Sequence, residues 1–136
     1  MKKIVSIFLV SLFLLMLSAC GSIKLADIYD ENEVIDRAKE VVNVINTHDY
    51  DAIQAELRDD LEDKVTPDQL KSAWEKTLSD AGDFQDYKSI TTVGQKSKST
   101  GEDYAQVVLV CNYENSTLIY TIVMDANLDI VGMYLK

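Results

Sequence analysis

The first half of this 136-residue chain has the hydrophobic period of helices, and the second half has the period of strands. Between residues 34 and 45, apolar residues recur at helical spacing and share one face. The stretch Thr66-Pro67-Asp68-Gln69 begins another helix, because it carries a capping threonine, a proline at the first helical position and a glutamine that closes a capping box. A shorter helix between these two is predicted from four residues: Tyr50, Ile53, Leu57 and Leu61.

From residue 84 onward the period changes to that of strands, and β-branched and aromatic residues accumulate. Four runs are bounded by short turn segments: 86–97, 103–114, 117–125 and 129–135. Connections this short favour hairpins, so the strands are predicted to form an antiparallel meander. Three helices followed by four strands indicate an α+β fold, with the N-terminal helices packed on the sheet.

The hairpin at Asn115-Ser116 is predicted to sort side chains onto two faces of the sheet. With a two-residue turn, Tyr113 opposes Leu118 and Cys111 opposes Tyr120, and this face is almost wholly apolar. The other face is mixed, but it is far from a solvated surface; it carries Val108, Val110, Asn112, Ile119, Thr121 and Val123. In the last strand, alternation points Ile130 and Tyr134 to one face and Val131, Met133 and Leu135 to the other.

The helices can cover only one face, so the second face raises the question of a pocket or an interface. Aromatic residues with polar tips, beside aliphatic ones, suit such sites. The candidate ligand or interface residues are Trp74, Tyr104, Tyr113, Val110, Ile119 and Tyr134. Ordinary strand and core packing is the alternative for each aromatic residue, and burial by curvature and the long first strand is the alternative for the face.

The N-terminal residues have the pattern of a secretion signal. Two lysines precede an apolar run over residues 4–17. As a helix this run would be about 21 Å long, which is short of a hydrocarbon core of about 30 Å. The run ends in Leu17-Ser18-Ala19-Cys20, which resembles the bacterial lipobox. In proteins with that motif, cleavage occurs before the cysteine, whose thiol accepts a diacylglycerol.

We therefore expect a lipoprotein signal peptide over residues 1–19, a lipidated tether over 20–29 and a single α+β domain over 30–136. The lipid on Cys20 would hold the chain on the extracytoplasmic face of the cell membrane. An ordinary signal peptide with a coincidental cysteine is the alternative.

The net charge and the motifs of the chain limit the classes of function further. With 13 basic and 23 acidic residues the net charge is −10, which argues against a nucleic-acid partner. The common nucleophile, nucleotide and zinc motifs are absent, and His48 with Cys111 cannot supply a zinc site, so no metal or cofactor is expected. Cys111 lies in a strand alternation and is expected to be a buried inert thiol. His48 is expected to cap the end of the first helix.

Two segments carry a family resemblance: LEDKVTPDQLKSAWEKTLSDAGDF from Leu61, and YAQVVLVCNYENSTLIYTIVMDANLDIVGMYLK from Tyr104. They resemble the bacterial domain of unknown function 3887 over about residues 33–136. The matching features are Thr66-Pro67, Trp74 and the closing turn and strand from Asp125 through Ile130 to Gly132. The resemblance implies a nuclear-transport-factor-2-like, cystatin-related architecture, in which a curved sheet wraps helices to form a cone. It implies no known activity.

Two functions of different classes follow. The first is a surface-tethered, non-enzymatic domain that binds a small ligand, a second copy of itself or another envelope protein. The second is a small enzyme of the cone-shaped superfamily that uses a cavity carboxylate and tyrosines, by analogy of fold. A deep pocket that holds a carboxylate beside a tyrosine would favour the enzyme.

Overall fold

The computed structural model describes residues 24–136, so the predicted signal peptide and Cys20 lie outside the described residues. Within this range, none of the helices is both long and apolar enough to cross a bilayer. The order of elements is helices first and strands afterwards, which confirms the predicted α+β fold class.

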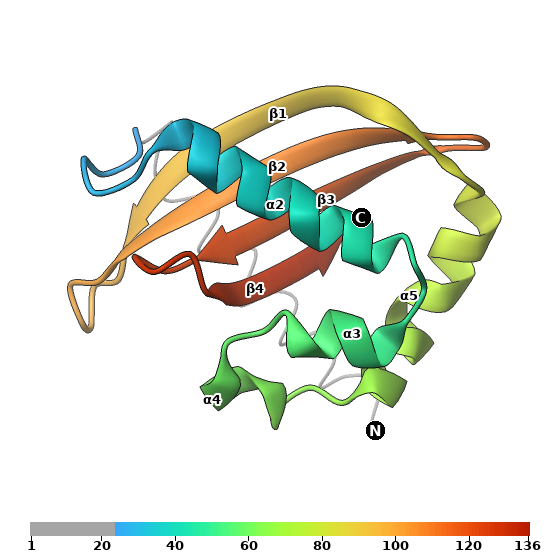
Figure 1. Cartoon of the computed structure of the whole chain (residues 1–136), viewed down its shortest axis with the longest axis horizontal. Helices are drawn as coiled ribbons and strands as arrows, with labels where there is room; N and C mark the ends of the chain where they lie inside the picture. The colour runs from blue at the N-terminus through green and yellow to red at the C-terminus, as the bar shows by residue number, and fades with distance from the viewer. Residues whose placement is uncertain (1–23) are drawn as a thin grey trace.

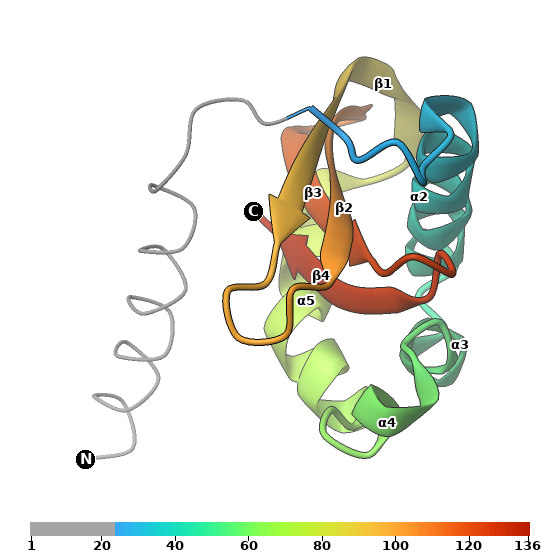
Figure 2. The same ribbon diagram turned by 90° about the vertical axis from the view of Figure 1, so that its left-hand side faces the viewer.

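The four strands form one antiparallel sheet in the order β1-β2-β3-β4, as predicted for a meander. Their bounds are β1 Phe84–Lys96, β2 Asp103–Tyr113, β3 Thr117–Met124 and β4 Ile130–Leu135. In Figure 1 the long strands arch over a helix, and in Figure 2 the sheet lies on one side of the domain with that helix on the other. The sheet is thus concave toward the helix and convex on its outer face.

The helix under the sheet is α2, Glu31–Ile45. Asp30 caps its first turn by accepting hydrogen bonds from two backbone amides, and five residues at helical spacing are buried: Val34, Ala38, Val41, Val42 and Ile45. The second long helix, α5, spans Pro67–Ala81 and begins with the predicted capping box, in which Thr66 and Gln69 each bond the backbone of the other. Local sequence signals fix the start of both helices.

The described residues contain four helices rather than three, because the predicted middle helix is interrupted. It divides into α3, Tyr50–Ala55, and α4, Asp59–Glu62. Between them Leu57 forms a parallel bridge with Ile130, and the Arg58 amide donates to the Ile130 carbonyl at 2.8 Å. Arg58 is extended, with φ −54° and ψ 142°. A backbone contact with the first residue of β4 therefore replaces the helical hydrogen bonds at this point.

The register of the β2–β3 hairpin differs from the prediction by two residues: Cys111 pairs with Leu118, and the last pair is Asn112 with Thr117. The cause lies outside the hairpin. The amide of Asn115 donates to the Ala81 carbonyl at 2.9 Å, and the amide of Glu114 donates to Asp83 at 2.8 Å, so the turn is docked on the end of α5. An even shift leaves every side chain on its predicted face.

The last strand contains an irregularity that the alternation did not predict. Met124 pairs with Ile130, but the preceding Val123 pairs with Gly132, so β4 holds one extra residue at this point. Antiparallel partners share a face, and Ile130 therefore points to the helices together with Met133 and Leu135. The prediction that Ile130 and Tyr134 share a face is wrong.

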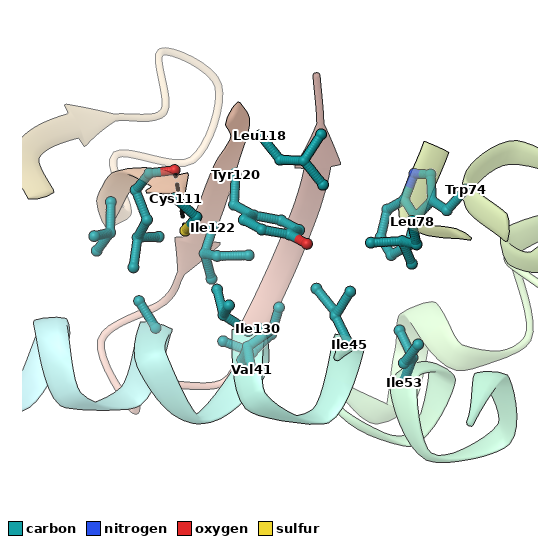
Figure 3. Close-up of a cluster of buried hydrophobic side chains, with 14 of the residues drawn as sticks. Val41, Ile45, Ile53, Trp74, Leu78, Cys111, Leu118, Tyr120, Ile122 and Ile130 are labelled. Atoms are coloured by element: carbon teal, nitrogen blue, oxygen red, sulfur yellow. Dashed lines mark hydrogen bonds between the residues drawn. The ribbon is translucent and has the colours of Figure 1, made fainter. Parts of the chain in front are cut away.

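The core fills the space between α2, α5 and the concave face of the sheet. Figure 3 shows Tyr120 and Ile122 of β3 pointing toward Val41 and Ile45 of α2; all four side chains are fully buried. The end of the expected tether also packs here. Leu25 and Tyr29 lie against the core, and the Tyr29 hydroxyl donates to the Asp103 carbonyl at 2.8 Å. Residues 24–29 are therefore attached to the domain.

Candidate functional site

The six candidate residues fall into two groups. Trp74 on α5 and Tyr113 on β2 are buried on the concave side, with exposed fractions of 8% and 5%. The remaining four lie on the convex face: Tyr104, Val110, Ile119 and Tyr134. The structure thus assigns Trp74 and Tyr113 to the core, and they do not share a surface with the others.

Val110 and Ile119 lie side by side on the convex face, on the two inner strands of the sheet. They are ladder partners, and Ile119 also exchanges two backbone hydrogen bonds of 2.9 Å with Lys136. Ile119 and Tyr134 are more than one third exposed, which is unusual for large apolar or aromatic residues of this domain. We call the following residues the outer patch: Val108, Val110, Ile119, Thr121, Val123 and Tyr134.

Polar side chains bound the outer patch at both ends of the strands. At one end Asn112 donates to Asp86 at 2.8 Å from the neighbouring strand. At the other end Gln95 donates to Gln106 at 2.8 Å. Gln106 is the one buried polar residue among those described, and this hydrogen bond gives its side chain a partner. The outer patch thus has apolar residues between two hydrogen-bonded polar pairs.

Tyr134 has a neighbour that the sequence pattern did not reveal. A Cβ atom placed on Gly132 would lie 3.1 Å from the ring and from the hydroxyl oxygen of Tyr134. The ring therefore covers the glycine and lies along the sheet. Packing of an aromatic ring on a strand glycine compensates for the missing side chain. The outer patch is consequently flatter than a projecting tyrosine would make it.

Tyr104, the fourth candidate on this face, lies farther along β2, opposite Gln95. Its hydroxyl donates to Glu102 in the β1–β2 hairpin at 2.7 Å. This hydrogen bond to the carboxylate raises the pKa of Tyr104. Tyr104 is thus engaged at the hairpin and lies outside the outer patch.

One cluster of ionisable residues was missed by sequence reasoning. The Tyr50 hydroxyl of α3 donates to the Glu75 carboxylate of α5, and the His48 ring lies 3.7 Å from the same carboxylate. The hydrogen bond from Tyr50 holds the pKa of Glu75 below its usual value. α2 ends at Ile45 with Asn46 as its C-cap, so His48 does not cap this helix as predicted. It lies in the α2–α3 connection with a left-handed φ of 58°, and its side chain is turned to Glu75 of α5. No spacing in the sequence links these three residues.

This cluster contains the carboxylate and tyrosine pair that the enzyme hypothesis needs, but it lies at the surface rather than deep in a pocket. Glu75 has 40% of its side chain exposed, and His48 has 37%. The three side chains join the α2–α3 connection and α3 to α5 at the surface, so their contacts tie the helices together. Within residues 24–136, no three histidine, cysteine or acidic side chains are grouped as metal ligands.

The core itself contains a chain of buried hydroxyl groups. Tyr113 donates to the Asn46 side chain, and its hydroxyl is hydrogen-bonded to that of Tyr120 at 2.6 Å. The Tyr87 hydroxyl is buried with no hydrogen-bond partner among the described residues. Desolvation by burial raises the pKa of Tyr87 and of Tyr113 to about 12. All of these tyrosines are therefore neutral at physiological pH.

Alkaline pH is expected to destabilise the fold. Burial raises the pKa of the Cys111 thiol to about 12, as it does for Tyr113. The unfolded chain ionises these groups near their ordinary values, about 8.5 for a thiol and about 10 for a phenol. Their contribution to stability is therefore complete below about pH 8 and is lost as the pH rises toward 12.

Denaturant unfolding at neutral pH and at about pH 10.5 measures this loss. The same samples give a second measurement, because a thiol reagent should react with Cys111 only as fast as the protein unfolds. Equal stability at both pH values, or rapid reaction of Cys111 in the native protein, would contradict the account.

The fold and its open convex face define a class: a one-sheet α+β domain with one long helix, α2, under the concave face and the other helices at one end of the sheet. The family model described as "Protein of unknown function (DUF3887)" matches residues 38–133. The chain belongs to this family, in agreement with the resemblance of its sequence motifs. A solved structure described as a protein from Ruminococcus gnavus ATCC 29149, determined by NMR, has a similar fold with a TM-score of 0.74. It is 22% identical, and the alignment covers 83% of this chain and 96% of that one. No curated protein matches the chain.

Proposed function

We propose that this protein is a membrane-tethered, non-enzymatic binding domain that uses the outer patch to hold a protein partner. The observation that carries the proposal is the cluster of partly exposed aliphatic side chains on the convex face, with Val110 beside Ile119. Apolar groups gathered on one face of a domain are typical of interaction sites. Binding of this kind needs no reactive residue.

The shape of the face favours a protein over a small molecule. Small ligands bind in concave sites that enclose most of their surface. The outer patch is on the convex side of the sheet, and Tyr134 lies along the strand rather than forming a wall. A protein surface can cover such a face, whereas a small molecule on it would remain largely in water.

The tether and the finer fold class are part of the proposal. The lipobox-like Leu17-Ser18-Ala19-Cys20 supports lipid attachment at Cys20 and a location on the extracytoplasmic face of the membrane. The single long helix α2 in the concavity of the sheet supports the nuclear-transport-factor-2-like, cystatin-related cone. The partner would then be another envelope protein or a second copy of the chain.

A photo-crosslinking amino acid at position 119 tests the proposal. In membranes that contain the full chain, we expect one discrete adduct from position 119. Position 71, an exposed lysine of α5, is the control and should give no adduct. The mass of the adduct separates a second copy, at twice the chain mass, from a different protein.

A second variant tests whether the adduct reports binding. Val110→Asp puts a charge in the outer patch beside position 119, and desolvating that charge in an interface would be costly. The adduct should be lost while thermal unfolding shows that the domain remains folded. An adduct that persists in Val110→Asp, or equal adducts from positions 119 and 71, would contradict the proposal.

A further inference from the structure

We propose that the β1–β2 hairpin end of the domain rests on the bilayer, where Lys24, Lys96 and Lys98 contact anionic phospholipid headgroups. The inference rests on the proposed lipid attachment at Cys20 and adds an orientation and a lipid-contacting surface to it. Three features lead to it: the length of chain after Cys20, the fixed place of Lys24 and the distribution of charge.

The first feature is the short connection to the lipid. Only three residues separate Cys20 from Lys24. Even fully extended, the chain from Cys20 to Lys24 reaches about 14 Å. Whichever part of the domain holds Lys24 is therefore kept close to the membrane surface.

The second feature is that Lys24 is held in one place on the domain. Its carbonyl lies directly against Gly94 of β1, so close that no side chain could occupy that position. Leu25 packs against the core, and Tyr29 donates to the Asp103 carbonyl. In Figure 1 the first described residues, the end of β1 and the β1–β2 hairpin all lie at one end of the sheet. The connection therefore draws this end toward the bilayer.

The third feature is the charge of the hairpin. Residues 94–101 contain Lys96 and Lys98 and no acidic residue, and both lysines are exposed. Among the described residues, no carboxylate lies within ion-pairing distance of Lys24, Lys96 or Lys98. Glu102 follows the turn and accepts the Tyr104 hydroxyl. Lysines near an anionic membrane surface are attracted to it.

The hairpin is ordered enough to present these lysines. The Ser97 amide donates to Glu102 at 2.8 Å, and the Gly101 amide donates back to Ser97 at 2.9 Å. Gly101 has the positive φ of 74° that this tight turn requires. Lys98 lies within the closed turn, so it is displayed at the tip of the hairpin.

Acidic residues gather at the opposite end of the sheet. There the β2–β3 turn is docked on the end of α5, and acidic residues gather around it: Asp80, Asp83, Asp86 and Glu114. β2 has 11 residues, so at about 3.4 Å per residue the two ends are roughly 35 Å apart. An anionic surface attracts Lys24, Lys96 and Lys98, although Glu102 and Asp103 offset part of their charge, and it repels the far turn. The outer patch would then stand to the side, open to a partner.

Fluorescence quenching in vesicles tests this orientation. The full lipidated chain is reconstituted in phosphatidylcholine and phosphatidylglycerol vesicles that carry a headgroup quencher. One variant, Ser99→Cys, takes a fluorophore at the hairpin, and the matched variant, Ser116→Cys, takes it at the far turn. Native Cys111 is fully buried and does not compete for the label. We expect the label at position 99 to be quenched several-fold more strongly.

Lysine variants test the role of charge. Lys96→Gln with Lys98→Gln should reduce the difference in quenching between positions 99 and 116, and so should vesicles of phosphatidylcholine alone. The matched control, Lys64→Gln with Lys71→Gln on the helical side, should leave it unchanged. If the hairpin variant and the control variant both keep the full difference in quenching, the proposed contact between these lysines and the headgroups is wrong.

The outcomes separate this inference from the lipid attachment on which it rests. Vesicle flotation and the intact mass report whether Cys20 carries a lipid. A chain that floats with vesicles and is quenched equally at positions 99 and 116, or more at 116, overturns the orientation alone. A chain without acyl mass that does not float overturns the attachment and the orientation together.

Discussion

Trp74→Ala is expected to lower the free energy of unfolding by about 3–5 kcal/mol, the range for removing a large aromatic side chain from a core. The indole is 92% buried on the apolar stripe of α5, between Leu70 and Leu78. Figure 3 shows it beside Leu78, with Ile53 of α3 facing the pair. The cavity would therefore open where α5 meets α3, a contact that holds the helical end of the domain together.

Chemical denaturation of the variant and the wild type measures this loss. Lys71→Ala is the matched control, because it is on the exposed side of the same helix and should change stability by less than about 0.5 kcal/mol. A loss under about 1 kcal/mol for Trp74→Ala would place the ring at a surface or in a ligand site, contrary to the core position described above.

Cys20→Ala is expected to move nearly all of the protein from the membrane fraction to the soluble fraction. In proteins with a lipobox the cysteine thiol is the nucleophile that accepts the lipid, and alanine has no group that can replace it. One acyl chain gives marginal attachment at about 0.8 kcal/mol per methylene, whereas two or three chains make it durable. Cys111→Ala is the control, because Cys111 is buried in the core and should not affect fractionation.

Detergent phase partition and intact mass are the measurements. The mass identifies the acyl group on the wild type, and it also reveals any variant chain that keeps residues 1–19. Wild-type protein that is already soluble would favour the ordinary signal peptide. Unchanged fractionation of a fully processed Cys20→Ala chain would refute attachment through this residue.

Local signals predicted most of the fold because the responsible interactions are close in sequence. The capping box at Thr66 and Gln69 and the apolar stripe that contains Trp74 are contained within α5 itself. Likewise, the period of two in β2 and β3 placed Cys111 and Tyr120 in the core, even though the predicted register was wrong. A period of two specifies the face of a strand, but it does not specify its partner residue.

Long-range contacts account for the errors. The β2–β3 register depends on hydrogen bonds from the turn to Ala81 and Asp83, and the division between α3 and α4 depends on the pairing of Leu57 with Ile130. These partners are more than 30 residues apart in sequence. Neither contact leaves a local pattern, so neither could be predicted from propensity or period.

The candidate site residues divide in the same way, into those that a local pattern predicts and those that long-range packing places. Strand alternation alone placed Val110 and Ile119 of the outer patch on one face, as the structure shows, but their direct pairing belongs to the register that the prediction missed. Tyr113 alternates with Cys111 and so belonged to the core face, where its hydroxyl finds a partner in Asn46, 67 residues away. The ring of Tyr134 over Gly132 and the cluster of Tyr50, Glu75 and His48 depend on packing that the sequence does not reveal.

The central claim is that a partner covers the outer patch while the protein is on its membrane. The most direct measurement is the rate at which a maleimide reacts with Ile119→Cys, first in isolated membranes that retain their proteins and then after purification in detergent. Lys71→Cys on α5 is the reference. We predict that reaction at position 119 is several-fold slower in membranes, while reaction at position 71 is the same in both states. Equal rates at position 119 in both states would contradict the claim.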